Sequence, residues 1–409
     1  MATITPFKAL RPQAQFARQV ASRPYDVLNS QEAKIEAQGN PYSFLHITKP
    51  EIDLPENTDV YSPAVYQKAT ENLKAFLQRD VLFRENKPCY YIYQLIMNNR
   101  SQTGLVCVSA VDDYENNIIK KHEFTRPDKE QDRINHIQIS GAQTGNVFLA
   151  YRNNQQVDSI IDQWKQRYTA VYDFSTEDGI RHSIWVVNND SIIQQISQLF
   201  ATAVDETYIA DGHHRAASAA KVRKALGDKV TVNAGYFLTT LFPSNQLQIM
   251  DYNRVVRDLN GLEEDAFLDL VAQQFEVEKS TVQHAPAHLH DFGMYLSSGW
   301  HKLTAREGSY TEDPIGVLDV SILQNNLLDK ILNIKDQRTD KRIDFVGGIR
   351  GLGELEKRVN SGEMKVAFSL YPVSIQQLFD IADSNNVMPP KSTWFEPKLR
   401  DGLFTHLID

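Results

Sequence analysis

Runs of β-branched and aromatic residues predict the strands of this chain. Residues 89–96 (CYYIYQLI) and 104–110 (GLVCVSA) flank the turn-like segment MNNRSQT, a pattern typical of a β-hairpin. A second hairpin is expected from residues 231–242 and 247–256, on either side of Pro243. Further strands are expected where short apolar runs recur, at residues 146–151, 170–174, 182–187 and 207–210.

Helical patterns lie between several of these strands. Asn29 is a suitable N-cap for a helix over residues 30–39, and Pro63 takes the first helical position of a longer helix within 62–82. An alanine-rich helix is expected over residues 215–226, ending at Gly227. Because helices and strands are interleaved, we expect a mixed α/β (α+β) fold.

The length of 409 residues is too great for one ordinary core and indicates two or three domains. No internal repeat or low-complexity linker marks their boundaries. We place the boundaries near residues 115 and 255, which divides the chain into regions 1–115, 116–255 and 256–409.

Composition indicates a compact soluble protein, with 42% hydrophobic and 23% charged residues. The net charge of −9 disfavours duplex DNA as a partner, because phosphate-backbone binding relies on clustered Lys and Arg. No apolar run resembles a signal peptide or approaches the roughly 18 residues of a membrane-spanning helix. Only Cys89 and Cys107 are present, so neither a disulfide framework nor a CxxC zinc site is expected. These features predict a cytoplasmic protein of undetermined oligomeric state.

The most informative stretch is ADGHHRAASA, residues 210–219, which joins an apolar strand to the alanine-rich helix. The first turn of a helix presents N–H groups without intrahelical partners and the positive end of the helix dipole. Gly212 allows close approach of a ligand, while His213, His214 and Arg215 add donors at the same point. Phosphate is the ligand that suits this turn best.

Asp211 has three possible roles in this interpretation: holding Mg²⁺, accepting a ribose hydroxyl or orienting a histidine. Two other interpretations remain open. Asp211 could cap the helix while both histidines fill a polar turn. Alternatively, His213 and His214 could form a metal site, although adjacent residues lack the i, i+4 spacing of helical zinc ligands.

ADGHHRAASA closely resembles the signature of an uncharacterised bacterial and archaeal family related to the ParB/sulfiredoxin superfamily and to nucleotide-dependent free serine kinases. The segments FKALRP, VASRPYDVL, NPYSFLHITKPEIDLP, KKHEFTRPDKEQDR and PPKSTWFEPKLRDGL resemble the same family, over essentially the whole chain. This resemblance implies a ParB/sulfiredoxin-like nucleotide-binding core with N- and C-terminal α/β embellishments.

The charged segment at residues 120–133 is expected to contain a solvated helix with i, i+3 pairs such as Glu130 with Arg133. Glu123 lies before that helix. In the serine kinases that this chain resembles, a glutamate in such a position takes the proton of the substrate hydroxyl, so the resemblance implies this role for Glu123.

Two weaker candidates lie near the chain ends. Tyr25 and Asp26 occupy a proline turn from which they could reach a ligand, although such turns are commonly structural. Lys391 belongs to a Pro-punctuated tail that could either wrap the body of the protein or deliver a cation to the phosphate site.

Together these observations predict a nucleotide-dependent phosphotransferase acting on a small hydroxyl compound. The resemblance implies ATP or ADP as the donor, Mg²⁺ as the cofactor and free L-serine as the acceptor. The expected catalytic residues are Glu123, Asp211 and His213, and residues 212–215 would bind phosphate. Two alternatives remain: a nucleotide-binding switch without turnover, as in ParB relatives, and a metal-dependent hydrolase that uses the histidine pair.

Overall fold

The computed structural model describes residues 1–409 and divides into two compact units. The first comprises Met1–Leu247 with Pro397–Asp409, and the second comprises Gln248–Glu396. Both contain helices and strands, which confirms the mixed α/β class. The expected boundary near residue 115 does not separate units, because strands on both sides of it join one sheet.

A nine-stranded sheet forms the centre of the first unit. Most of its pairs are antiparallel, but β11 with β6 and β12 with β8 run parallel. Along the sheet, the order is β6 (Ile119–Lys120), β11 (Thr207–Asp211), β8 (Val147–Tyr151), β12 (Tyr236–Pro243), β5 (Arg100–Ala110), β4 (Tyr90–Met97), β10 (Arg181–Val187) and β9 (Tyr172–Ser175), with β1 (Ile4–Thr5) paired to β5.

One of the two expected hairpins is confirmed and the other is wrong. β4 and β5 pair in antiparallel fashion around Asn98 and Asn99, whose positive φ values suit a tight hairpin turn. β12, by contrast, pairs with β5 and β8 within the first unit. β14 (Tyr252–Val256) belongs to the sheet of the second unit. The local pattern around Pro243 identified the strands but not their partners.

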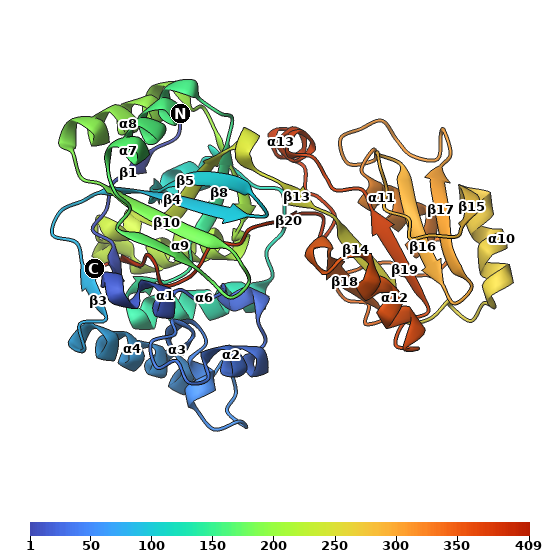
Figure 1. The fold of residues 1–409 in the computed structure, drawn as a ribbon, viewed down its shortest axis with the longest axis horizontal. Coiled ribbons are helices and arrows are strands. Elements are labelled where there is room, and N and C mark those ends of the chain that lie inside the picture. Colours follow the sequence, from blue (N-terminus) through green and yellow to red (C-terminus); the bar gives the residue numbers. More distant parts are fainter. The chain divides into compact units, whose positions relative to one another are not determined.

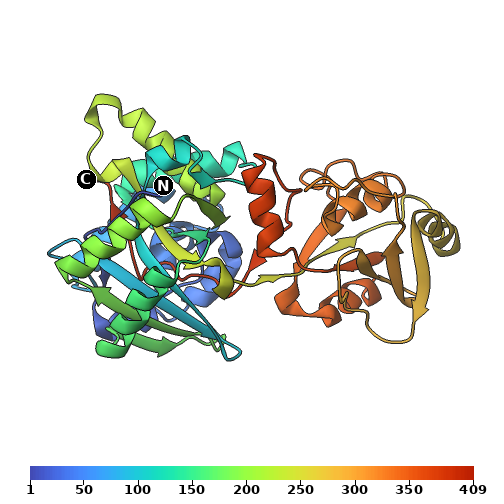
Figure 2. The ribbon, with the colours of Figure 1, turned by 90° about the horizontal axis from the view of Figure 1, so that it is seen from above.

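Helices surround the sheet of the first unit (Figure 1). A core of buried apolar residues joins the sheet to α7, α8 and α9, and a separate core joins α4 to the N-terminal segments. Figure 2 gives the view from above. The helices are α1 (Ala17–Val20), α2 (Ser30–Ala37), α3 (Leu45–Thr48), α4 (Pro63–Gln78), α5 (Val111–Glu115), α6 (Pro127–Ser140), α7 (Gln155–Arg167), α8 (Asp190–Ala203) and α9 (His213–Leu226).

The charged helix α6 is not the solvated helix that its sequence predicts. Glu130, Arg133 and His136 are buried. Glu130 pairs with Lys221 of α9 rather than with Arg133. Because α6 packs against both α4 and α9, several of its polar residues face neighbouring elements instead of water.

The C-terminal segment 397–409, dark red in Figure 1, returns to the first unit. Asp401 forms an isolated β-bridge with Ser22, and Thr405 forms one with Leu10. The segment ends in β21 (His406–Leu407), which pairs with β7 (Ala142–Gln143), while β2 (Leu10–Pro12) pairs with β3 (Leu82–Arg84). The second unit is therefore an insertion between Leu247 and Pro397.

The second unit contains a six-stranded antiparallel sheet in the order β15-β17-β16-β19-β14-β18. Its strands are β14, β15 (Phe275–Ser280), β16 (Asp291–Leu296), β17 (Gly299–Ala305), β18 (Ile343–Gly347) and β19 (Val366–Leu370), beside a short pair of β13 (Ile249–Met250) and β20 (Trp394–Phe395). Its helices are α10 (Glu264–Gln274), α11 (Asp319–Leu323), α12 (Leu352–Asn360) and α13 (Ile375–Asp383). None of the helices in either unit combines the length and apolar character needed to cross a membrane.

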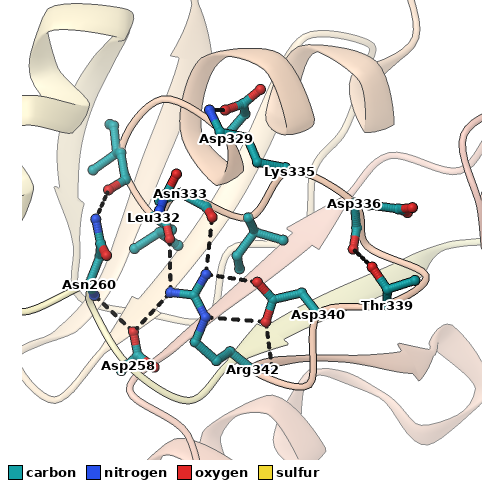
Figure 3. Close-up of polar contacts among 12 residues, drawn as sticks. Asp258, Asn260, Asp329, Leu332, Asn333, Lys335, Asp336, Thr339, Asp340 and Arg342 are labelled. Atoms are coloured by element: carbon teal, nitrogen blue, oxygen red, sulfur yellow. Dashed lines mark hydrogen bonds and ion pairs between the residues drawn. The ribbon is translucent and has the colours of Figure 1, made fainter.

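Arg342 organises the loop that precedes β18 (Figure 3). Its guanidinium donates to the carbonyl oxygens of Leu332 and Asn333, at 3.0 and 3.1 Å. It also pairs with Asp340 at 2.7 Å and with Asp258 at 3.4 Å. The planar fork of arginine suits this multiple contact, and the loop is thereby held to the start of the strand.

Asp319 is a buried acid in the second unit, only 3% exposed. One carboxyl oxygen accepts the backbone N–H of His290 at 2.8 Å, and the other has no hydrogen-bond partner. Burial raises the pKa of Asp319 to about 7, although the His290 N–H opposes this shift. The folded protein therefore retains a proton here at pH values where the unfolded chain has lost it.

We expect Asp319→Asn to stabilise the protein at pH 8, by about 2–4 kcal/mol in the free energy of unfolding. A raised pKa means that stability is lost as pH rises from about 4 to about 7, and asparagine removes this loss. Urea unfolding of the full chain between pH 4 and 8 measures the effect. The exposed Asp269→Asn variant is the control, and an identical pH slope for the wild type and Asp319→Asn would contradict the prediction.

Candidate active site

Two loops of the first unit emerge side by side at the carboxyl ends of neighbouring strands. β6 and β11 pair in parallel, with Thr207 opposite Ile119. Parallel strands end at the same side of a sheet, so the loop after β6 and the turn after β11 are neighbours. The helices that follow, α6 and α9, also pack together (Figure 1). Glu123 is thus brought near the turn at Asp211, across 88 positions of sequence.

Gly212 forms the turn between β11 and α9. It is the N-cap residue, with φ of +100°, a conformation that residues with a side chain rarely adopt. A Cβ atom here would lie 3.2 Å from the Arg215 guanidinium and 3.4 Å from Cα of Val147. The side chain of Asp211 accepts from Lys398 at 2.9 Å, and no hydrogen bond joins it to the helix N-terminus, which contradicts its expected alternative role as a cap.

We expect Gly212→Ala to lower the free energy of unfolding by about 1–3 kcal/mol, because it combines backbone strain with a close approach to Arg215. Gly179→Ala is the matched control. Gly179 also has a positive φ, +79°, but nothing lies within 4 Å of its added Cβ. Denaturant unfolding of both variants separates backbone strain from the close approach to Arg215. If both variants lose the same free energy of unfolding, the contact with Arg215 contributes nothing.

The two histidines hold the loop that carries Glu123. Nε2 of His213 accepts the backbone N–H of His122 at 3.4 Å, and Nε2 of His214 accepts that of Arg126 at 2.9 Å. Since Nε2 is the acceptor, the proton of neutral His213 resides on Nδ1, which lies 3.8 Å from the Glu123 carboxylate. His213 therefore lies beside the candidate base and holds the backbone of its loop.

Burial keeps His213 and the neighbouring His122 neutral. Burial and the neighbouring His122 hold the pKa of His213 well below its ordinary value. His122 packs edge-on against His213 with ring centroids 4.5 Å apart, and burial lowers its pKa to about 4. The Nε2 lone pairs of His213 and His214 are used by backbone N–H groups, which disfavours the pair as metal ligands. No group of three or more His, Cys, Asp or Glu side chains is placed to hold a metal ion.

Arg215 is the central cation of the site and is only 8% exposed. Nη2 lies 3.2 Å from the carboxylate of Asp26 and 3.5 Å from that of Asp211, while Nη1 donates to the carbonyl of Asn146. Burial would lower the pKa of Arg215, but Asp26 and Asp211 raise it above its ordinary value. Arg215 is therefore charged, and it joins the N-terminal proline turn to the glycine turn.

Lys398 completes the charge cluster and was not among the predicted site residues. Its ammonium lies 2.9 Å from the carboxylate of Asp211. Burial would raise the pKa of Asp211, but Lys398 and Arg215 lower it below its ordinary value, so this carboxylate is ionised. The cationic C-terminal tail is the sequence signal for such a residue, but the lysine predicted from it is Lys391 and not Lys398.

Lys391 lies in the second unit, where its ammonium is 5.9 Å from the centroid of the Tyr252 ring. Tyr25 and Asp26, by contrast, belong to the cluster in the first unit. The backbone N–H of Tyr25 donates to the Asp401 carboxyl at 3.3 Å, and burial raises the pKa of Asp401 to about 7 against the opposing effect of Arg215.

The candidate site thus lies in a mixed α/β unit. It combines the Glu123 carboxylate near a glycine turn with the buried Arg215 and the half-buried Lys398. The chain belongs to the family described as "Protein of unknown function (DUF1015)", which matches residues 4–321. This match confirms the expected membership of an uncharacterised family but leaves residues 322–409 outside the matched range. No curated protein matches the chain.

Three solved structures are distantly similar. A conserved hypothetical protein from Pyrococcus furiosus is 14% identical, with a TM-score of 0.36, covering 74% of this chain and 94% of its own. A free serine kinase variant in complex with AMP is 12% identical, with a TM-score of 0.37, covering 73% and 92%. SbnI with a C-terminal truncation, from Staphylococcus aureus, is 12% identical, with a TM-score of 0.32, covering 72% and 85%.

Proposed function

We propose that this protein is a nucleotide-dependent phosphotransferase that phosphorylates a small hydroxyl compound. The observation that carries the proposal is the juxtaposition of Glu123, through His213, with the glycine turn at the start of α9. The resemblance of ADGHHRAASA to the signature of free serine kinases supports ATP or ADP as the donor and free L-serine as the acceptor.

Each residue has a defined part in the proposed reaction. The acceptor hydroxyl attacks the terminal phosphorus, a new P–O bond forms, and the bond to the leaving nucleotide phosphate breaks. Glu123 accepts the hydroxyl proton, and His213 lies beside its carboxylate. Arg215 and Lys398 supply positive charge beside the phosphates, and the first turn of α9 supplies backbone N–H groups.

The site offers Mg²⁺ one protein ligand, the carboxylate of Asp211. A single carboxylate, Asp211, would hold the ion together with nucleotide phosphate oxygens, a combination typical of magnesium in phosphoryl transfer. The bound ion would neutralise phosphate charge. Its binding requires that Lys398 release the Asp211 carboxylate, and phosphate is the natural new partner for the displaced ammonium.

Phosphorus NMR of the full chain with Mg²⁺, ATP or ADP, and a panel of hydroxyl compounds led by L-serine tests the proposal. A new phosphomonoester signal, lost in Glu123→Gln, is the expected result. Nucleotide binding without turnover would favour the alternative function, a nucleotide-binding switch that catalyses no reaction. Failure of the protein to bind nucleotide at all would contradict our interpretation of the turn.

A further inference from the structure

The loop between β6 and α6, residues 121–126, inverts the usual burial of polar and apolar side chains. His122 is only 2% exposed, yet neither of its ring nitrogens has a hydrogen-bond partner. Phe124, two positions further on, is 68% exposed and is the most exposed aromatic side chain of the protein. A buried polar group without a partner and an exposed apolar ring both cost free energy, and such exceptions are expected at functional sites.

His122 is costly in this position as a purely structural residue. Burial lowers its pKa to about 4 against the opposing effect of Asp211, so the imidazole is neutral at pH 7 and carries one N–H donor and one lone pair. An apolar side chain of similar size would fill the same space without leaving a donor unpaired. The equally buried His136 shows the contrast, because its Nε2 pairs with the carbonyl oxygen of Ile47 at 3.0 Å. The imidazole of His122 is therefore better explained by binding than by packing.

The His122 ring lies against the N-terminus of α9. It packs edge-on against His213, the first residue of that helix, with ring centroids 4.5 Å apart. No side chain caps this helix, so N–H groups of its first turn remain available to an anion. Arg215, in the same turn, adds a buried positive charge. A phosphate group suits this combination, because its oxygens accept from several N–H groups at once.

The loop is attached in a way that permits movement. The backbone N–H of His122 donates to Nε2 of His213 at 3.4 Å, and that of Arg126 donates to Nε2 of His214 at 2.9 Å. Both acceptors are side chains, and neither bond belongs to a sheet or helix ladder. The exposed ring of Phe124 leaves few buried contacts behind when the loop shifts. Segments with few buried apolar contacts are the ones that open and close at low cost.

We infer that His122 is a phosphate-binding residue and that residues 121–126 act as a lid over the first turn of α9. When a phosphate group binds at this turn, the loop shifts, a ring N–H of His122 donates to a phosphate oxygen, and Phe124 shields the group from water. Closure thus gives the buried imidazole a partner and covers the exposed ring. Identifying this phosphate with that of the nucleotide rests on the proposed function, whereas the binding of phosphate itself does not.

Calorimetric titration of the full chain with inorganic phosphate and with ADP, both without Mg²⁺, tests the role of His122. His122→Leu should weaken the binding of both ligands by roughly tenfold, because a charge-assisted hydrogen bond is lost. Its free energy of unfolding should equal or exceed that of the wild type, because an unpaired buried donor is removed. His122→Gln retains a side-chain N–H and should recover most of the affinity. Wild-type affinity in His122→Leu overturns the assignment.

His136→Leu is the matched control for this substitution. His136 is also a buried histidine, but its ring has a partner in the carbonyl oxygen of Ile47. Its replacement should lower the free energy of unfolding, because that carbonyl loses its partner, and should leave the affinity for phosphate unchanged. If His122→Leu behaves in the same way, His122 is a structural residue and the inference fails.

Hydrogen exchange measured by mass spectrometry tests the lid without any change at His122. Inorganic phosphate should slow the exchange of the amides of residues 121–126 in the wild type. Phe124→Ser should remove most of this protection without changing the free energy of unfolding, because the ring is exposed in the free protein. Val282→Ser, at a 69% exposed position of the second unit, should leave the protection intact. Equal exchange with and without bound phosphate contradicts a lid.

The inference and the proposed function fail in different ways. Phosphate binding that depends on His122, in a protein that transfers no phosphate, would retain the inference and reject the proposed function. Phosphoryl transfer by a His122→Leu variant that binds phosphate and ADP as tightly as the wild type would retain the proposed function and reject the inference. Absence of phosphate and ADP binding in the wild type would reject both.

Discussion

Replacement of Arg215 by methionine is expected to lower the free energy of unfolding by about 3–5 kcal/mol. Arg215 is almost fully buried, and its guanidinium is the shared partner of Asp26 and Asp211. Removing it leaves Asp26 without this ion pair and Asp211 with Lys398 alone. Losing one member of a buried ion pair costs much more than the pair itself contributes, because the remaining charge is poorly solvated. Urea unfolding of the full chain gives the difference directly.

Arg223→Met is the matched control for this prediction. Arg223 lies on the same helix and pairs with Asp112, but its side chain is 28% exposed and that of Asp112 is 62% exposed. Ion pairs in such positions contribute only about 0–1 kcal/mol. If both substitutions cost the same, Arg215 would not be the organising cation of the site. The double variant with Asp26→Asn should cost less than the sum of the two single changes, because both remove one shared interaction.

Glu123→Gln is expected to lower kcat of the proposed phosphoryl transfer by about 10²- to 10⁴-fold. Glutamine retains the size and hydrogen-bonding ability of glutamate but cannot accept the hydroxyl proton. The affinity for nucleotide should change little, because the loss concerns the proton acceptor and not the groups beside the phosphates. The side chain is 39% exposed, so the free energy of unfolding should also stay close to that of the wild type. Steady-state rates by phosphorus NMR and nucleotide binding by calorimetry measure the two quantities separately.

Asp128→Asn serves as the comparison for Glu123→Gln. Asp128 lies in the first turn of α6, close in sequence to Glu123, and its ion-pair partner is the exposed Arg126. Its substitution should leave kcat within about twofold, because a surface ion pair of this kind contributes little. A normal kcat in Glu123→Gln would remove Glu123 from the mechanism, whereas parallel losses of nucleotide affinity and turnover would assign it to binding.

The sequence specified the elements that depend on neighbouring residues. Asn29 caps α2 with a capping box to Glu32, and Pro63 begins α4, as expected from their positions. The β4–β5 hairpin followed from its polar turn. The hairpin expected around Pro243 failed because strand pairing is a long-range choice. Once β12 pairs with β5 and β8, no edge remains for β14, which joins a sheet formed by residues far along the chain.

The sequence by itself also determined the local form of the site, because a glycine between a strand and an alanine-rich helix permits the positive-φ turn seen at Gly212. Tertiary structure decided what surrounds that turn. Parallel pairing of β6 with β11 brought Glu123 to His213, and the returning C-terminal segment brought Lys398 to Asp211. Packing of α6 also turned Arg133, which its charged neighbours predicted to be solvated, onto the ring of Tyr25. The physical reason is that helix and turn preferences act over a few residues, whereas the partners of buried charges are chosen by the contacts of the whole fold.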